Sequence, residues 1–266
     1  MIGSENLKKR IISAIVMILI VLPLIVFGGL YLKIGTVVLG ACSMYELLKQ
    51  KNNMPLFIKI ISIISVMLVI YFSNSFSIFS NLYFFPILFL LFFISVVFIE
   101  EKEKYNLSDA LYVIGSIIFI SISFITFNMI REKSIFYFVY IILIATMTDT
   151  FALFGGTLFG RHKLCPKISP NKTIEGSVIG TIFGVFISAL FIVFTCKLNI
   201  NLFVLILITI LLSIMGQFGD LFFSSIKRSF NIKDFSNLIP GHGGILDRLD
   251  SLIFISLTYI LFMGMF

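Results

Sequence analysis

The sequence predicts an all-α, polytopic integral membrane protein with about nine transmembrane helices and a cytoplasmic N-terminus. Of its 266 residues, 59% are hydrophobic and only 12% are charged, whereas a soluble domain is about 45–50% apolar and about 25% charged. The stretch from Ile60 to Ile99 holds no Asp, Glu, Lys or Arg, and about 20 apolar residues suffice for one membrane-spanning helix. These observations exclude a soluble fold, a disulfide scaffold and a disordered chain.

Charges, prolines and polar clusters divide the chain into the expected spans. The first follows the basic residues 8–10 and has no small-residue cleavage site, so it is expected to be retained rather than removed as a signal peptide. The polar residues 73–81 split the long apolar stretch into two spans joined by a tight hairpin, and Ser108 is the expected N-cap of the fifth span. The nine expected spans are 11–32, 34–48, 55–73, 82–99, 107–130, 135–148, 177–196, 200–216 and 251–266.

The distribution of basic residues gives the expected orientation. With the N-terminus inside, the inner segments hold 16 of the 20 Lys and Arg residues. This is the bias that the positive-inside rule predicts. The net charge of +7 is therefore a sign of topology. It is not evidence of nucleic-acid binding, which requires a basic face on a soluble module.

Two regions are expected along the chain. Residues 1–133 form a membrane scaffold on the lipid side, and residues 134–266 form a catalytic membrane domain. The catalytic domain contains two cytoplasmic segments, 149–176 and 216–250, that hold most polar residues which lipid contact does not explain. The three cysteines are widely spaced and form no C-x-x-C pair, so neither a disulfide framework nor a zinc site is indicated.

The segment 216–250 contains four carboxylates beside four basic side chains. If residues 220–229 are helical, Asp220, Ser224 and Lys227 lie on one face. Carboxylates beside bases suit phosphoryl chemistry with a hard cation, because Mg²⁺ takes oxygen ligands together with substrate phosphates. The alternative is a set of surface ion pairs, and for Asp234 both interpretations stay open. Asp247 and Asp250, like Asp220, adjoin expected spans, where an unpartnered carboxylate is costly.

The run from Pro240 to Gly244 is expected to be a turn whose successive backbone N–H groups form an anion cradle, with a simple hinge as the alternative. In the segment 149–176, Ser169, Lys172 and Thr173 offer hydroxyls and an ammonium group suited to phosphate oxygens. For Asp149, which follows the sixth expected span, a capping or packing role and a catalytic role both stay open.

Together the two segments resemble the phosphatidate cytidylyltransferases, which are integral membrane enzymes of phospholipid synthesis. The C-terminal signature of that family is matched by Ser224, Lys227, Arg228, Lys233, Asp234, His242, Gly243, Gly244, Asp247, Arg248 and Asp250. Its upstream pattern is matched by Asp149, Thr150, Gly156, Gly160, Pro166, Ser169, Pro170, Lys172, Thr173, Glu175 and Gly176.

The resemblance implies transfer of a cytidylyl group from CTP to phosphatidic acid, giving CDP-diacylglycerol and pyrophosphate, at the cytoplasmic face of a bacterial inner membrane. It implies Mg²⁺, with a monovalent cation such as K⁺, held by Asp220, Asp247 and Asp250, with Asp234 as a further candidate. It also implies a homodimer. The implied catalytic residues are Asp220, Asp247, Asp250, Lys227 and Arg228, and the implied substrate-binding residues are Ser169, Lys172, Thr173, Ser224, His242, Gly243 and Gly244.

Two other functions compete with this interpretation. A cation- or proton-coupled transporter would distribute its ionisable residues over several spans with pseudo-repeats, whereas here they gather in two segments. A related CTP-dependent lipid-phosphate transferase or kinase fits the same residues. The CDP-alcohol phosphotransferases are excluded, because the chain lacks their D-G-x-x-A-R run.

Overall fold

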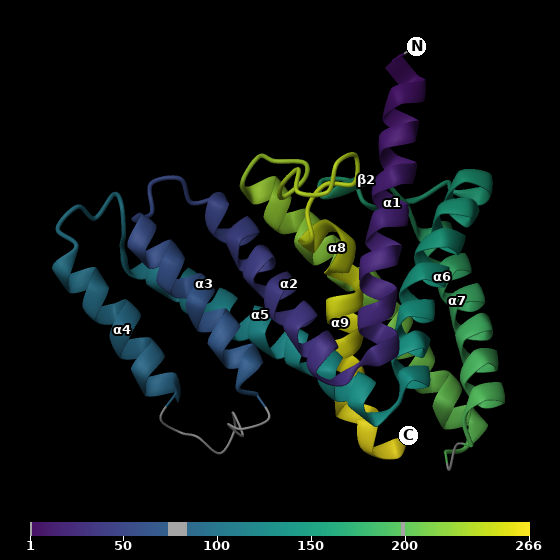
Figure 1. The fold of residues 1–266 in the computed structure, drawn as a ribbon. Helices are drawn as coiled ribbons and strands as arrows, with labels where there is room; N and C mark the ends of the chain where they lie inside the picture. The colour runs from purple at the N-terminus through teal and green to yellow at the C-terminus, as the bar shows by residue number, and fades with distance from the viewer. Residues whose placement is uncertain (1, 74–83, 198–199) are drawn as a thin grey trace. The chain divides into compact units, whose positions relative to one another are not determined.

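The computed structural model describes residues 2–73, 84–197 and 200–266. Within these residues the chain is nearly all α-helical, as the sequence predicts, with one short two-stranded antiparallel sheet (Figure 1). The elements are α1 (Ile2–Phe27), α2 (Gly29–Lys49), α3 (Leu56–Tyr71), α4 (Phe84–Phe98), α5 (Leu107–Lys133), α6 (Ile135–Phe159), β1 (Lys163–Cys165), β2 (Ser169–Thr173), α7 (Ile174–Thr195), α8 (Leu202–Ser229), α9 (Leu246–Phe262) and the 3₁₀ turn η1 (Met263–Met265).

Six helices in the described part of the chain are long and apolar enough to cross a membrane: α2, α5, α6, α7, α8 and the stretch Leu246–Met265. Three shorter apolar helical stretches, Ile11–Phe27, Leu56–Tyr71 and Pro86–Phe98, match the first, third and fourth expected spans. Large apolar side chains such as Phe98 (80% exposed) and Phe194 (84% exposed) lie open on these helices, which is where a lipid-facing residue belongs. The chain is therefore an integral membrane protein. Most of the expected polar hairpin at 73–81 lies outside the described residues.

Several helix ends differ from the expectation. The sequence places the boundary between the first and second spans at residue 33, but α1 ends at Phe27 and α2 begins at Gly29, because Gly28 between them has φ 62° and interrupts the helix. The sixth and eighth spans were expected to end at residues 148 and 216, but α6 continues to Phe159 and α8 to Ser229, because the charged residues beyond those points have partners and do not need to leave the helix. The expected N-cap Ser108 is wrong. The Asn106 side chain accepts a hydrogen bond from the Asp109 N–H (3.1 Å), and the Asp109 carboxylate accepts one from the Asn106 N–H (3.2 Å), a reciprocal capping arrangement.

The chain divides into two compact units. Unit 1 comprises Met1–Asn128 with Phe235–Ile245, and unit 2 comprises Met129–Asp234 with Leu246–Phe266. In unit 1, α2 packs beside α3 (Figure 1). This close approach depends on Gly40, where a Cβ would lie 2.5 Å from the Ile70 side chain and 3.4 Å from Phe124. The segment 235–245, which belongs to one of the two predicted functional segments, is thus part of unit 1. The predicted division of function between a scaffold of residues 1–133 and a catalytic domain of residues 134–266 stays a prediction.

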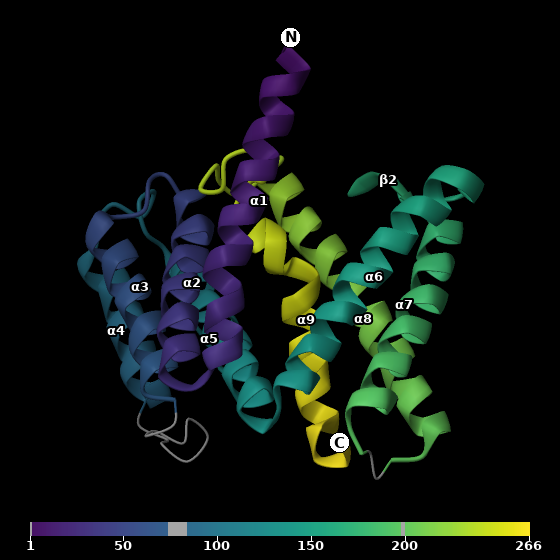
Figure 2. The same cartoon turned by 45° about the vertical axis from the view of Figure 1, so that its right-hand side comes forward.

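In unit 2, α6 lies along α7 in both views (Figure 1, Figure 2). Gly176, Gly180 and Gly184 of α7 allow this contact: a Cβ at Gly180 would lie 2.5 Å from the Thr148 carbonyl oxygen, and small residues at such spacing let membrane helices approach closely. Hydrogen bonds from α8 to the other two helices join Thr148 to Ser213 (2.8 Å) and Gln217 Nε2 to Thr181 (2.8 Å). These hydrogen bonds fix α6, α7 and α8 against one another within the unit, near the ends of α6 and α8 that are expected to face the cytoplasm.

Candidate functional site

Four aspartates from three helices of unit 2 form one group, here called the aspartate cluster: Asp149 on α6, Asp220 on α8, and Asp247 and Asp250 on α9. Asp149, Asp220 and Asp250 act electrostatically on one another, and Lys227 acts on Asp250 as well as pairing with Asp247. Asp149 is exposed, and Asp220 and Asp250 are half-buried. The cluster is therefore both concentrated in charge and open on one side.

Close helix packing brings these side chains together. Gly219 has no side chain, and a Cβ there would lie 2.6 Å from the Asp250 carbonyl oxygen, so α8 and α9 meet at backbone distance beside Asp220. Ser251 links two members of the cluster, since its hydroxyl donates to Asp149 Oδ2 (3.5 Å) and its N–H donates to Asp250 Oδ1 (2.8 Å). The Asp149 carboxylate thus lies in the same group as the other three, and its catalytic and its packing role both stay predictions.

Two lysines are bound to the cluster. Lys172 on β2 forms an ion pair with Asp220, and both side chains are about a quarter exposed. Lys227 Nζ lies 2.7 Å from Asp247 Oδ1. The Ser224 hydroxyl donates to Asp220 Oδ1 (3.3 Å) one helical turn away, so the predicted shared face of Asp220, Ser224 and Lys227 is confirmed. The cluster holds four carboxylates against two ammonium groups, an excess of oxygen donors.

The β1–β2 hairpin places Lys172 beside α8. The two strands pair antiparallel, with Cys165 opposite Ser169 and Lys163 opposite Thr173. The Thr173 hydroxyl accepts a hydrogen bond from the Gly176 N–H (3.2 Å) and is the N-cap of α7. Thr173 is only 8% exposed, so its predicted role as a phosphate ligand competes with a structural one. Ser169, at the start of β2, is half-buried.

The predicted catalytic residue Arg228 is not in the aspartate cluster. Its guanidinium is exposed and donates to two backbone carbonyls of unit 2, from Nε to Ile168 (3.3 Å) and from Nη1 to Ile232 (3.1 Å). These bonds tie the end of α8 to the loops on either side of it. Asp234, the further metal candidate, is exposed on the loop after α8.

The predicted residues His242, Gly243 and Gly244 lie in unit 1, in the segment 235–245, here called the glycine loop. The prediction that successive N–H groups of this loop are free to bind an anion is wrong for His242 and Gly243. The N–H groups of His242 and Gly243 both donate to the Ile239 carbonyl (2.9 and 3.1 Å), because the chain reverses there in a tight turn. Gly243 has φ +84°, which only glycine adopts readily.

Helices α1 and α2 hold the glycine loop. His242 Nδ1 lies 2.7 Å from the Ser13 hydroxyl, and Gln50 Nε2 donates to the Phe235 carbonyl (2.9 Å). Glu46, which is fully buried, accepts hydrogen bonds from Ser236 and from the Ile245 N–H. The sequence interpretation missed Glu46, although a carboxylate inside an expected span is by itself a signal of a functional or partnered residue.

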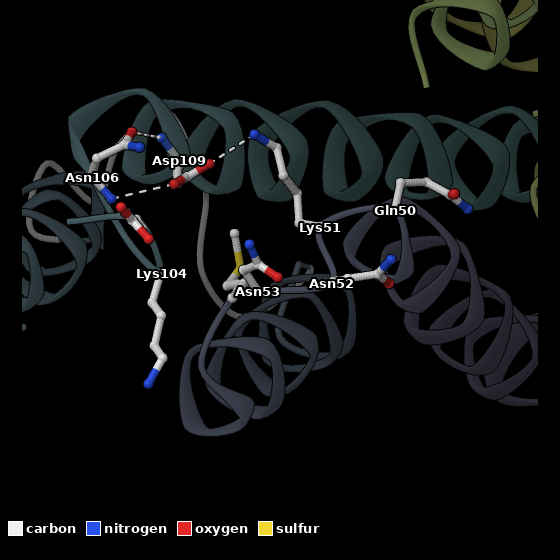
Figure 3. Close-up of a pocket in the computed structure, with 9 residues that line it drawn as sticks. Gln50, Lys51, Asn52, Asn53, Lys104, Asn106 and Asp109 are labelled. Atoms are coloured by element: carbon white, nitrogen blue, oxygen red, sulfur yellow. Dashed lines mark hydrogen bonds and ion pairs between the residues drawn. The ribbon is translucent and has the colours of Figure 1, made fainter. Parts of the chain in front are cut away.

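A polar pocket of about 410 Å³ also lies in unit 1, between the loop after α2 and the loop before α5. Figure 3 shows Lys51 and Asp109 joined across it by an ion pair of 2.7 Å, with the amide groups of Asn52 and Asn106 nearby. Its lining contains no residue predicted from the sequence motifs, so the pocket adds nothing to the aspartate cluster or the glycine loop.

The carboxylate oxygens of the aspartate cluster are candidate ligands for a metal ion. Carboxylate oxygens are the protein ligands that Mg²⁺ prefers. Among residues 2–73, 84–197 and 200–266, however, no three Asp, Glu, His or Cys side chains are arranged to hold a metal ion. Lys172 and Lys227 instead form ion pairs with Asp220 and Asp247. The chemistry of the carboxylate donors fits Mg²⁺, although their described arrangement does not form a metal site.

Comparison with known proteins covers nearly the whole chain. The model of the cytidylyltransferase family matches residues 8–266. A phosphatidate cytidylyltransferase of Staphylococcus haemolyticus is 36% identical over 252 residues, which cover 94% of this chain and 96% of the relative. Proteins of the same name from Staphylococcus saprophyticus and Staphylococcus aureus are each 35% identical, again over 94% of this chain and 96% of the relative. The match includes the elements that carry the aspartate cluster and the glycine loop.

Proposed function

The chain belongs to the cytidylyltransferase family, and from that membership we propose that it transfers the cytidylyl group of CTP to phosphatidic acid, giving CDP-diacylglycerol and pyrophosphate for phospholipid synthesis. It is a nucleotidyltransferase, and relatives named for this activity cover 94% of the chain. The observation that carries the proposal is the aspartate cluster with its two lysines, because ammonium groups bind phosphate oxygens and carboxylates are the ligands that a hard cation prefers.

The proposed reaction requires little acid–base chemistry. An oxygen of the lipid phosphate forms a bond to the α-phosphorus of CTP, and the bond from that phosphorus to the oxygen of pyrophosphate breaks. The attacking phosphate is already an anion, so no strong general base is needed. Catalysis consists of aligning two anions in line and compensating charge on the transferred phosphorus.

Each part of the site has a proposed role in this reaction. Lys227, Lys172 and Arg228 bind phosphate oxygens in this proposal, with Ser224, Ser169 and Thr173 as hydroxyl donors. Asp220, Asp247 and Asp250 would hold Mg²⁺, with Asp234 as the further candidate and a monovalent cation such as K⁺ beside it. When bound, the metal would supply positive charge to the phosphate oxygens. His242, Gly243 and Gly244 of the glycine loop are also proposed to bind substrate, as the sequence motif predicts.

We propose that each of the helices α1 to α9 in the described residues crosses or enters the bacterial inner membrane, with the N-terminus in the cytoplasm and the active site facing the cytoplasm. The support is the distribution of charge, since 16 of 20 basic residues then lie on the inner side. That side is where CTP is available. A homodimer is part of the same proposal, by analogy with the family.

The experiment uses membranes that contain this chain, phosphatidic acid, and CTP radiolabelled on either the α- or the γ-phosphate. We expect label from the α-phosphate in a lipid, release of pyrophosphate, and loss of both on addition of EDTA with recovery on excess Mg²⁺. Label entering the lipid from the γ-phosphate would indicate a CTP-dependent lipid kinase instead. No labelled lipid in either case, together with ion flux in vesicles, would indicate a transporter.

A further inference from the structure

The glycine loop is anchored by one buried carboxylate. Glu46 lies on α2 with an exposed fraction of 0%. Its Oε1 accepts a hydrogen bond from the Ser236 hydroxyl (2.6 Å) near the start of the loop and another from the Ile245 N–H (2.8 Å) at its end. One side chain therefore clamps both ends of the loop that contains His242.

Gly244 shows how closely the loop is pressed on this carboxylate. A Cβ at Gly244 would lie 2.5 Å from Glu46 Oε1 and 2.8 Å from Oε2, which is closer than real side chains approach. The φ of Gly244 is not among the positive values found in the loop, so an alanine there meets no backbone strain. The three atoms nearest to such a Cβ all belong to Glu46, so this carboxylate accounts for the absence of a side chain at this position.

Two further contacts of unit 1 support the same loop. Gln50, one turn after Glu46, donates from Nε2 to the Phe235 carbonyl (2.9 Å) and to the Glu46 carbonyl (3.2 Å). Ser13 of α1 lies 2.7 Å from His242 Nδ1. The loop residues 235, 236, 242 and 245 are thus each bonded to a helix near the beginning of the chain.

We propose that Glu46 is a positioning residue for cytidylyl transfer: it fixes both ends of the glycine loop within unit 1 and so sets the conformation in which the loop offers His242 to the substrate. The inference rests on the proposed function, because it assigns Glu46 a task in that reaction.

Packing alone does not account for this residue. A carboxylate in a membrane-spanning helix lowers stability unless its partners offset the free energy of removing it from water. An apolar residue of similar volume would fill the same space without that loss. The Ser236 hydroxyl and the Ile245 N–H, which both belong to the loop, donate hydrogen bonds to Glu46 Oε1. The side chain is therefore arranged for the loop.

The first experiment compares Glu46→Ala and Glu46→Gln with the unchanged protein in detergent. Hydrogen bonds to a buried charged group are strong, so we expect Glu46→Ala to raise the KM for CTP by about 10-fold to 100-fold while kcat changes by less than about threefold. Glu46→Gln keeps an acceptor oxygen and is expected to recover most of the loss. Thr36→Ala is the matched control, because Thr36 is equally buried on α2 but bonds to Asn128. It should lower stability without changing KM.

The second experiment uses the clash at Gly244. Gly244→Ala alone is expected to lower kcat/KM by about 10-fold or more, because its Cβ displaces the Glu46 carboxylate. In the double variant Glu46→Ala with Gly244→Ala, the clash is gone, so the double variant should be no worse than Glu46→Ala. Such non-additivity is what coupled residues show. Multiplicative losses would overturn the inference, as would a KM in Glu46→Ala within about twofold of the unchanged protein.

The two proposals fail in different ways. If the unchanged protein makes no CDP-diacylglycerol, the proposed function is wrong. If the unchanged protein is active and Glu46→Ala matches it, only the inference about Glu46 is wrong. Should Glu46→Ala fail to fold, the pair Gly244→Ala and Glu46→Asp with Gly244→Ala decides the same question. The shorter side chain withdraws its carboxylate from the added Cβ, so this double variant should recover part of the activity that Gly244→Ala loses, and no recovery would overturn the inference.

Discussion

Lys227 Nζ lies 2.7 Å from Asp247 Oδ1, and this ion pair joins the last turn of α8 to the first turn of α9. Both side chains are well covered, with exposed fractions of 11% and 3%. The cation lies at a helix C-terminus and the anion at a helix N-terminus, so each also interacts favourably with its own helix dipole. Removing one partner leaves the other charge in a covered position.

Lys227→Met is therefore expected to destabilise the protein by about 3–5 kcal/mol, because the buried Asp247 carboxylate loses its ion pair with Lys227. The double variant Lys227→Met with Asp247→Leu should recover most of that stability but none of the activity. Thermal unfolding followed by circular dichroism in detergent measures the first effect, and labelled CDP-diacylglycerol measures the second. Recovery of activity in the double variant would show that the pair is purely structural.

Asp220→Asn is expected to lower cytidylyl transfer by about 100-fold or more with little change in thermal unfolding. The amide keeps the volume of the side chain but removes the charge that pairs with Lys172. Glu101→Gln is the matched control, since Glu101 pairs with Lys104 in an exposed position, and it should leave activity unchanged. Near-normal turnover of Asp220→Asn would remove the aspartate cluster from the mechanism.

Gly180→Ala is expected to destabilise unit 2 by about 1–3 kcal/mol, because its Cβ would meet the backbone of α6 at the Thr148 carbonyl. Gly115→Ala provides the comparison. Gly115 lies in a helix of the same kind, and a Cβ there meets nothing within 4 Å, so it should be neutral or stabilise by up to about 1 kcal/mol. Equal melting temperatures for the two variants would contradict the close α6–α7 packing.

Thr173→Ala is expected to cost about 1 kcal/mol by removing the N-cap of α7, and Thr173→Ser, which keeps the hydroxyl, should restore it. Melting temperature and KM for CTP are measured on the same preparations. If Thr173 also binds phosphate as the sequence motif predicts, the alanine variant alone shows a raised KM. A raised KM with unchanged stability would contradict the capping role.

The helices were predictable because each apolar run is long and bounded by charge or polar residues. Their ends were less predictable, since a charge stops a helix in lipid only when it has no partner. Asp149 and Asp220 have partners in other elements, so α6 and α8 run on past them. The residue type of Ser108 predicts an N-cap there, but the reciprocal hydrogen bonds of Asn106 and Asp109 decide where α5 begins.

Part of the site also followed from local spacing. The shared face of Asp220, Ser224 and Lys227 depends only on helical periodicity, and the structure confirms it. The contacts of Asp149 with Ser251 and of Lys172 with Asp220 depend on helix packing over long separations, which one sequence does not reveal. The glycine loop shows the same limit, because its turn uses its own N–H groups and its anchor, Glu46, lies far away in the chain.

The bonds from Glu46 to Ser236 and Ile245 connect residues that are 190 and 199 positions apart. During synthesis α2 is therefore complete long before Ser236 and Ile245 leave the ribosome, and until then the Glu46 carboxylate lacks these two donors. Docking of the glycine loop comes at the end of assembly, after every helix except α9 has been made. A chain that misassembles at this step keeps its helices and loses its activity first.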